Sequence, residues 1–107
     1  LSRGRPMKPQ NFYMESLKSL VLKEFASEDV RVILFGSRAR GDAHPGSDAD
    51  LALVPGKNFS LIKLSNLREK IDDSNIPFRV DIVNTHEISP EFQNQIKKDG
   101  IVWKDFN

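Results

Sequence analysis

The sequence predicts a single α/β (α+β) domain in which helices pack on a small mixed β-sheet. Two kinds of segment alternate along the chain in the order α-β-β-α-β-α: amphipathic stretches with apolar residues at three- and four-residue steps, and short apolar runs rich in β-branched residues. At 107 residues the chain can build one hydrophobic core but not two. We therefore expect residues 7–107 to form one domain, and interpret residues 1–6 as an addition from cloning.

The first three predicted elements lie in the N-terminal half. Residues 12–26 are expected to form an amphipathic helix, with an apolar face that comprises Met14, Leu17, Leu20, Val21 and Phe25. Residues 30–35 are apolar and β-branched, which is typical of a buried strand. Residues 50–54 form a second apolar run, which Pro55-Gly56 ends, and predict a second strand.

A second long helix is expected after Ser60, its predicted N-cap. Phe59 and Leu64 have the spacing of a hydrophobic staple, which supports this start. The apolar face of the helix is predicted to comprise Leu61, Leu64, Leu67 and Ile71.

The C-terminal third is predicted to contain a strand, a helix and a short last strand. Residues 78–83 follow Pro77 and alternate as a strand does. Ser89, Pro90 and Glu91 are typical of a helix start, and Gly100 of its end. Residues 101–103 are expected to form the final strand.

The charge balance and the composition exclude several classes of function. The chain has 16 basic and 15 acidic residues, and leaving out Arg3 and Arg5 lowers the basic count to 14, for a net charge of −1. A protein that grips long nucleic acid needs a basic surface, so none is expected here. No apolar run reaches the roughly 20 residues of a membrane span. Cysteine is absent, which excludes thiolate metal sites and favours a cytoplasmic location.

The loop between the first two strands has the composition of a phosphate site. Residues 37–41 (SRARG) can form a single helical turn, with Ser37 as N-cap and Gly41 as a left-handed stop. The backbone N–H groups at such a turn suit phosphate oxygens, to which further donors would come from Ser37, Arg38 and Arg40. The same residues also fit a plain connecting turn with solvated arginines, and the loop alone does not decide between the two interpretations.

Two closely spaced carboxylates favour a ligand. Asp48 and Asp50 are two residues apart, so in an extended chain both side chains project from one face. Two like charges side by side repel each other, and a divalent cation such as Mg²⁺ removes that cost because it binds carboxylate and phosphate oxygens together.

A third carboxylate, Asp81, lies in the middle of the third predicted strand. Its neighbours Val80 and Ile82 are expected to face the core, which places Asp81 on the opposite face. An unpaired carboxylate there is costly, so the alternative to a metal ligand is a salt bridge to Arg79 or Lys63. A shared site requires the first two strands to be antiparallel and the third to lie beside the second.

Gly36-Ser37, ten further residues, and Asp48-Ala49-Asp50 together resemble the signature of the DNA polymerase beta-like nucleotidyltransferases. Asp81 within Arg79-Val80-Asp81-Ile82-Val83 strengthens the likeness, which extends over nearly all of residues 12–103. The chain looks most like the minimal nucleotidyltransferases, many of which act as antitoxins beside a HEPN-type toxin. The resemblance implies a nucleotidyltransferase fold.

The resemblance also implies roles for the candidate residues. Asp48, Asp50 and Asp81 would be catalytic and would bind two Mg²⁺ ions, while Gly36 and Ser37 would hold the triphosphate of ATP. The implied activity is AMP transfer from ATP to a hydroxyl group, with a tyrosine or other hydroxyl of a HEPN-type toxin as acceptor. Two alternatives stay open: a transferase that modifies a drug or metabolite, and an antitoxin that blocks its partner by binding alone.

Overall fold

The computed structural model describes residues 10–107, so the interpretation of residues 1–6 lies outside the described part. The elements are α1 (Gln10–Glu24), β1 (Val30–Phe35), α2 (Ser37–Arg40), β2 (Ala49–Pro55), α3 (Leu61–Asp72), β3 (Val80–Asn84), the 3₁₀ turn η1 (Thr85–Glu87), α4 (Pro90–Asp99) and β4 (Ile101–Lys104). This order confirms the predicted α/β class. Among the described residues, no helix has the length and apolar character needed to cross a membrane.

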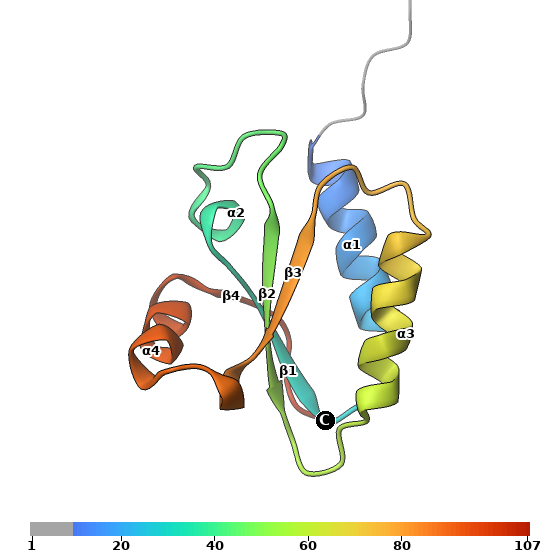
Figure 1. Cartoon of the computed structure of the whole chain (residues 1–107), viewed down its shortest axis with the longest axis vertical. Helices are drawn as coiled ribbons and strands as arrows, with labels where there is room; N and C mark the ends of the chain where they lie inside the picture. Colours follow the sequence, from blue (N-terminus) through green and yellow to red (C-terminus); the bar gives the residue numbers. More distant parts are fainter. Residues whose placement is uncertain (1–9) are drawn as a thin grey trace, which may run out of the picture.

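The sheet has the strand order β3-β2-β1-β4 (Figure 1). Strand β2 runs antiparallel to β1, and β3 lies beside β2, as the sequence predicted; the β2–β3 pairing is parallel. The short β4 pairs antiparallel with the free side of β1. The start of β2 and the start of β3 therefore lie side by side, next to the end of β1.

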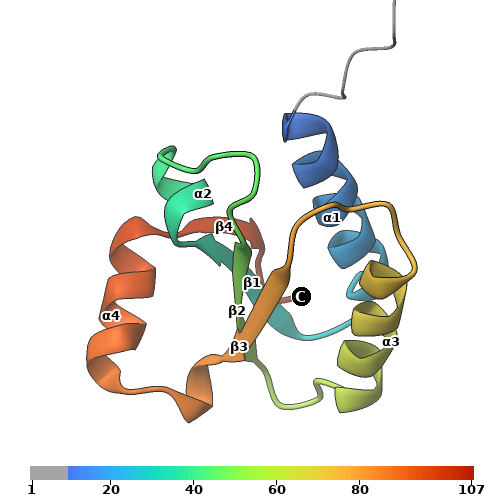
Figure 2. The ribbon, with the colours of Figure 1, turned by 45° about the horizontal axis from the view of Figure 1, so that its top comes forward.

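Helices cover both faces of the sheet, with α1 and α3 on one side and α4 on the other (Figure 2). The larger core lies under α1 and α3, and its strand residues are Val30, Val32, Leu34, Ala49, Leu51 and Leu53. Ile33, Ala52 and Ile96 form a smaller core under α4. Because strand residues alternate between faces, Asp50 shares the α4 face with Ala52. Val80 and Ile82 pack toward the larger core, so Asp81 also lies on the α4 face, as predicted.

Helix α3 is anchored less regularly than predicted. Leu67 is fully buried and Leu64 and Ile71 pack on the core, but Leu61 is 67% exposed, so the prediction that Leu61 belongs to the buried face was wrong. Ser60 is the N-cap, yet its side chain caps no N–H group.

Buried Glu24 ties α1 to α3. Its carboxylate pairs with Lys70 at 2.8 Å and Lys63 at 3.9 Å. Lys63, one of the two salt-bridge partners considered for Asp81, therefore pairs with Glu24 and not with Asp81.

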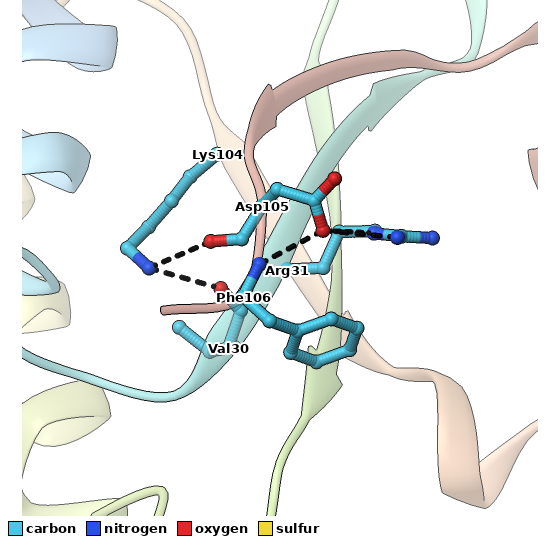
Figure 3. A network of polar contacts seen from close by, with 5 residues as sticks. All are labelled: Val30, Arg31, Lys104, Asp105 and Phe106. Carbon is cyan, nitrogen blue, oxygen red and sulfur yellow. Dashed lines mark hydrogen bonds and ion pairs between the residues drawn. The ribbon is translucent and has the colours of Figure 1, made fainter.

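A polar network joins the last residues of the chain to the start of β1 (Figure 3). The Lys104 ammonium donates to the carbonyl oxygens of Glu28 and Val30, at 2.9 and 3.2 Å. Arg31 pairs with Asp105 at 2.9 Å and lies over the Phe106 ring. These contacts hold β4 against β1 at the end of the sheet remote from Asp50.

Candidate active site

The turn after β1 is built on two glycines with positive φ. Gly36 has φ 76° and is the N-cap of α2, so the prediction of Ser37 as N-cap was wrong; Ser37 is the first helical residue. Gly41 has φ 86° and ends the turn in the left-handed conformation, as predicted. The Gly36 carbonyl accepts hydrogen bonds from the N–H groups of Ala39 and Arg40, both at 3.1 Å. The helix is only one turn long.

Gly36 also permits a close approach to Asp50. Asp50 lies opposite Phe35 in the β1–β2 pairing, and Phe35 directly precedes Gly36 in the chain. A Cβ atom at Gly36 would overlap the Oδ2 atom of Asp50. The turn backbone and this carboxylate are thus in direct contact, at a place where only glycine fits.

Asp50 and Asp81 are cross-strand neighbours in the parallel β2–β3 pairing. Asp48 precedes β2 by one residue. Burial raises the pKa of Asp50, the negative charges of Asp81 and Asp48 raise it further, and Arg40 opposes the shift. Asp48 and Asp81 therefore both lie close enough to Asp50 to repel its carboxylate.

The donor set suits a hard divalent cation, although the side chains are not gathered around one point. Within residues 10–107, no group of three or more acidic, histidine or cysteine side chains has the arrangement of a metal site. Asp81 accepts a hydrogen bond from Arg79 Nε at 3.0 Å, which is the salt bridge that the sequence offered as the alternative to a metal-ligand role. Carboxylate oxygens are the ligands Mg²⁺ prefers, and a cation would relieve the repulsion at Asp50. Asp48, Asp50 and Asp81 fit Mg²⁺ by the type of their donor atoms, and joint binding requires them to move closer together.

The two arginines of the loop have different surroundings. Arg40 is half exposed and pairs with Asp42 at 3.3 Å. The Arg38 guanidinium instead donates to the Ser47 carbonyl and stacks on the Phe78 ring. No local sequence signal indicates this stacking, because the arginine and the ring belong to distant segments of the chain.

The structure contains clefts, but those near the site are shallow and do not contain the carboxylates. A cleft of about 290 Å³ beside α2 is lined by Asn11, Met14, Arg38, Gly41, Ala43 and Pro45. A cleft of about 510 Å³ lies between α1 and residues 74–76. The aspartates line neither cleft and lie at the sheet end.

Comparison with known proteins identifies the family of this fold. Residues 20–105 match the family described as "Polymerase beta, Nucleotidyltransferase". A Haemophilus influenzae protein named "Probable protein adenylyltransferase MntA" is 34% identical over 74 residues, which are 69% of this chain. The matched region spans 65% of that relative's length.

Solved structures share the fold. One described as a minimal nucleotidyltransferase has a TM-score of 0.69 and 26% identity, covering 92% of this chain and 98% of the other. A toxin-antitoxin complex with AMP-PNP has a TM-score of 0.64 and 22% identity, covering 84% and 74%. The complex of a tri-AMPylated Shewanella oneidensis HEPN toxin with its MNT antitoxin has a TM-score of 0.60 and 20% identity, covering 91% and 73%.

Proposed function

Because the chain belongs to the polymerase beta nucleotidyltransferase family, we propose that it is a protein adenylyltransferase of the antitoxin type, which transfers AMP from ATP to a hydroxyl group of a HEPN-type toxin. The cross-strand pair of Asp50 and Asp81 carries this proposal. The two acidic residues are neighbours on the face of the sheet that α4 covers. Asp48 and the glycine turn lie next to them. Such a cluster is costly. The ion pair of Asp81 with Arg79 offsets part of the cost, but Asp48 and Asp81 still raise the pKa of Asp50, and a cation would relieve that repulsion.

Each residue has a defined part in the proposed reaction. Asp48, Asp50 and Asp81 would hold two Mg²⁺ ions, which lower the pKa of the attacking hydroxyl and neutralise charge on the phosphates when bound. The acceptor oxygen attacks the α-phosphorus of ATP, and pyrophosphate leaves. Asp81 would help activate the acceptor hydroxyl by taking its proton, while Gly36 and Ser37 would hold the triphosphate at the turn.

A protein acceptor is favoured because the aspartates line neither of the two clefts described above, so no acceptor pocket in those clefts includes them. The clefts beside α2 and α1 are lined by other residues. The relative named as a protein adenylyltransferase, and the neighbour that forms a complex with an AMPylated HEPN toxin, support the same acceptor class. A cytoplasmic location, expected from the cysteine-free sequence, is part of this proposal.

The test is AMP transfer to the protein encoded by the adjacent gene. We would incubate the full chain with that protein, labelled ATP and Mg²⁺, and measure intact masses. The expected result is a gain of one or more AMP units on the neighbour, abolished in an Asp48→Asn, Asp50→Asn double variant.

Two other outcomes would replace the proposal. Label on a small molecule, with the neighbouring protein unmodified, would show a metabolite- or drug-modifying transferase. Neutralisation of the toxin by the double variant, without any label, would show an antitoxin that acts by binding alone.

A further inference from the structure

Arg38 connects the loop before Asp48 to α2. Its guanidinium donates to the Ser47 carbonyl oxygen from Nε at 3.0 Å and from Nη2 at 2.7 Å, and to the Pro45 carbonyl oxygen at 3.3 Å. Ser47 is the residue directly before Asp48. Two donors on one carbonyl fix the direction in which the chain enters β2.

The same guanidinium contacts the chain where it enters β3. It lies 4.0 Å from the centre of the Phe78 ring. Phe78 is only 7% exposed and belongs to the main core. The backbone adds a further link, since Ala49 N–H donates to the Arg79 carbonyl at 2.9 Å. Arg38 therefore links the buried Phe78 ring, which precedes Asp81 in the chain, to the Ser47 carbonyl, which precedes Asp48.

The chemistry of an arginine suits this position better than that of a lysine. Burial lowers the pKa of Arg38 and the negative charge of Asp48 opposes that shift, yet a guanidinium stays charged throughout the physiological range. Its planar fork donates two hydrogen bonds to one carbonyl while its face stacks on an aromatic ring. A lysine ammonium keeps the charge but has neither the fork nor the flat face.

We propose that Arg38 is a positioning residue, which fixes the backbone that carries Asp48 relative to the start of β3, and so sets the separation of Asp48 from Asp50 and Asp81. This inference rests on the proposed function only in its consequence for metal binding. The alternative is the role expected from the sequence, in which Arg38 binds the phosphates of ATP directly. The ligand-free protein separates the two roles: loss of positioning changes the loop and the metal affinity without nucleotide, whereas loss of a phosphate contact changes only the binding of ATP.

The test compares Arg38→Lys with the matched control Arg31→Lys. Arg31 also pairs with polar groups and lies over an aromatic ring, 5.0 Å from Phe106, but at the far end of β1 (Figure 3). The first readout is amide hydrogen exchange of residues 42–48 in the full chain without ligands. Arg38→Lys should speed exchange there by about tenfold or more, because the loop loses its anchor, and Arg31→Lys should leave it unchanged.

The second readout is the affinity for Mn²⁺ without nucleotide. Residues that orient metal ligands typically change metal affinity by about 10- to 100-fold when replaced, so Arg38→Lys should weaken Mn²⁺ binding by at least about tenfold. Binding of ATP in EDTA should stay within about twofold of the wild-type value, because a positioning residue makes no contact with the phosphates. A third variant, Phe78→Leu, keeps an apolar side chain in the core and removes the ring. It should reproduce the faster loop exchange.

Each outcome decides the inference. If amide exchange of residues 42–48 were unchanged in Arg38→Lys, the proposed positioning role would be overturned. It would also be overturned if exchange became faster while the affinity for Mn²⁺ stayed at the wild-type value. Loss of ATP binding in EDTA, with the loop and Mn²⁺ affinity intact, would establish the phosphate role instead. If the wild-type chain bound neither Mn²⁺ nor Mg²⁺-ATP, the proposed function would fail, while the exchange data would still decide whether Arg38 holds the loop.

Discussion

At the level of single residues, the conformation of Gly36 decides how closely the turn after β1 approaches Asp50. Its positive φ is costly for any L-residue with a side chain, and an added Cβ would also meet the Asp50 carboxylate. Gly41 has a similar φ, but nothing lies within 4 Å of an added Cβ. Alanine at Gly41 therefore adds backbone strain alone, whereas alanine at Gly36 also displaces the Asp50 carboxylate.

Gly36→Ala and Gly41→Ala should both destabilise the protein, by about 1–2 kcal/mol each, because both place alanine at positive φ. Only Gly36→Ala should also abolish Mg²⁺-dependent ATP binding, since it moves Asp50. Chemical denaturation and calorimetric titration measure the two effects. Equal loss of ATP binding in both variants would show that the turn conformation, and not the position of Asp50, controls the site.

Asp50 should make the metal-free protein less stable as pH rises. Burial and its two acidic neighbours raise the pKa of Asp50 in the folded state. When the pKa of a carboxyl group is higher in the folded state than in the unfolded state, the group stabilises the protein at pH values below its unfolded-state pKa. That stabilisation is lost as the pH rises through the folded-state pKa. In EDTA, Asp50→Asn should therefore melt a few degrees above the wild type at pH 7, and the difference should vanish near pH 3.

The measurement is a series of thermal melts in EDTA from pH 3 to pH 8. Mg²⁺ with ATP should stabilise the wild type and not Asp50→Asn, which reverses their order. If Asp50→Asn melted below the wild type at pH 7 without metal, the carboxylate would instead be a structural hydrogen-bond acceptor.

At the level of elements, the two long C-terminal helices begin in different ways. Ser89 accepts a hydrogen bond from the Phe92 N–H at 3.1 Å, with Pro90 at the first helical position. Ser60 makes no side-chain cap. Its backbone N–H instead donates to the Glu28 carboxylate at 2.8 Å, a bond that alanine would keep. The same residue type thus has different energetic roles at the two helix starts.

Ser89→Ala should cost about 1 kcal/mol, or about 4–8 °C in melting temperature, because it leaves the Phe92 N–H without its acceptor. Ser60→Ala, the matched control, should change stability by no more than a few tenths of a kcal/mol. Thermal melts of both variants test this. Equal losses would mean that the geometry of the caps does not determine their contribution.

At the level of the whole molecule, ligand binding should raise global stability most when metal and nucleotide are both present. A ligand at a hundredfold excess over its dissociation constant stabilises a protein by about 2.7 kcal/mol. Mg²⁺ with ATP should therefore raise the melting temperature more than ATP in EDTA or Mg²⁺ alone does at the same concentration. The Asp48→Asn, Asp50→Asn variant should show no increase, and a retained increase would place the nucleotide elsewhere.

Most of the fold could be predicted because its signals are local. The apolar run of β1 and the cap at Ser89 are visible in a few consecutive residues, and both were placed correctly. The three residues of η1 have no periodicity and were missed. Helical spacing grouped Leu61 with the buried residues of α3, but it does not show whether another element covers that face, and Leu61 is exposed.

The candidate site could be predicted in its residues and less well in their contacts. Alternation placed Asp81 on the face opposite Val80 and Ile82, and the expected position of the third strand beside the second brought it to the same edge as Asp50, where the two are neighbours. The close approach of Gly36 to Asp50 brings together residues of two different strand ends, which no local pattern contains. The contact of Arg38 with Phe78 depends on the packing of two distant segments in three dimensions, and the sequence indicated only the positive charge.

The pairing of β1 also has a consequence for how the chain is made. β1 is flanked by β2, which follows soon after it, and by β4, which ends at Lys104 near the end of the chain. On the ribosome, residues emerge at about 5–20 per second, so β1 waits several seconds for its second neighbour. During that interval the backbone groups of Val32–Leu34 on one side of β1 are open to other chains, as any unpaired strand edge is. Newly made copies are therefore most vulnerable to co-aggregation before β4 is synthesised, and a chaperone that shields β1 would protect them for that time.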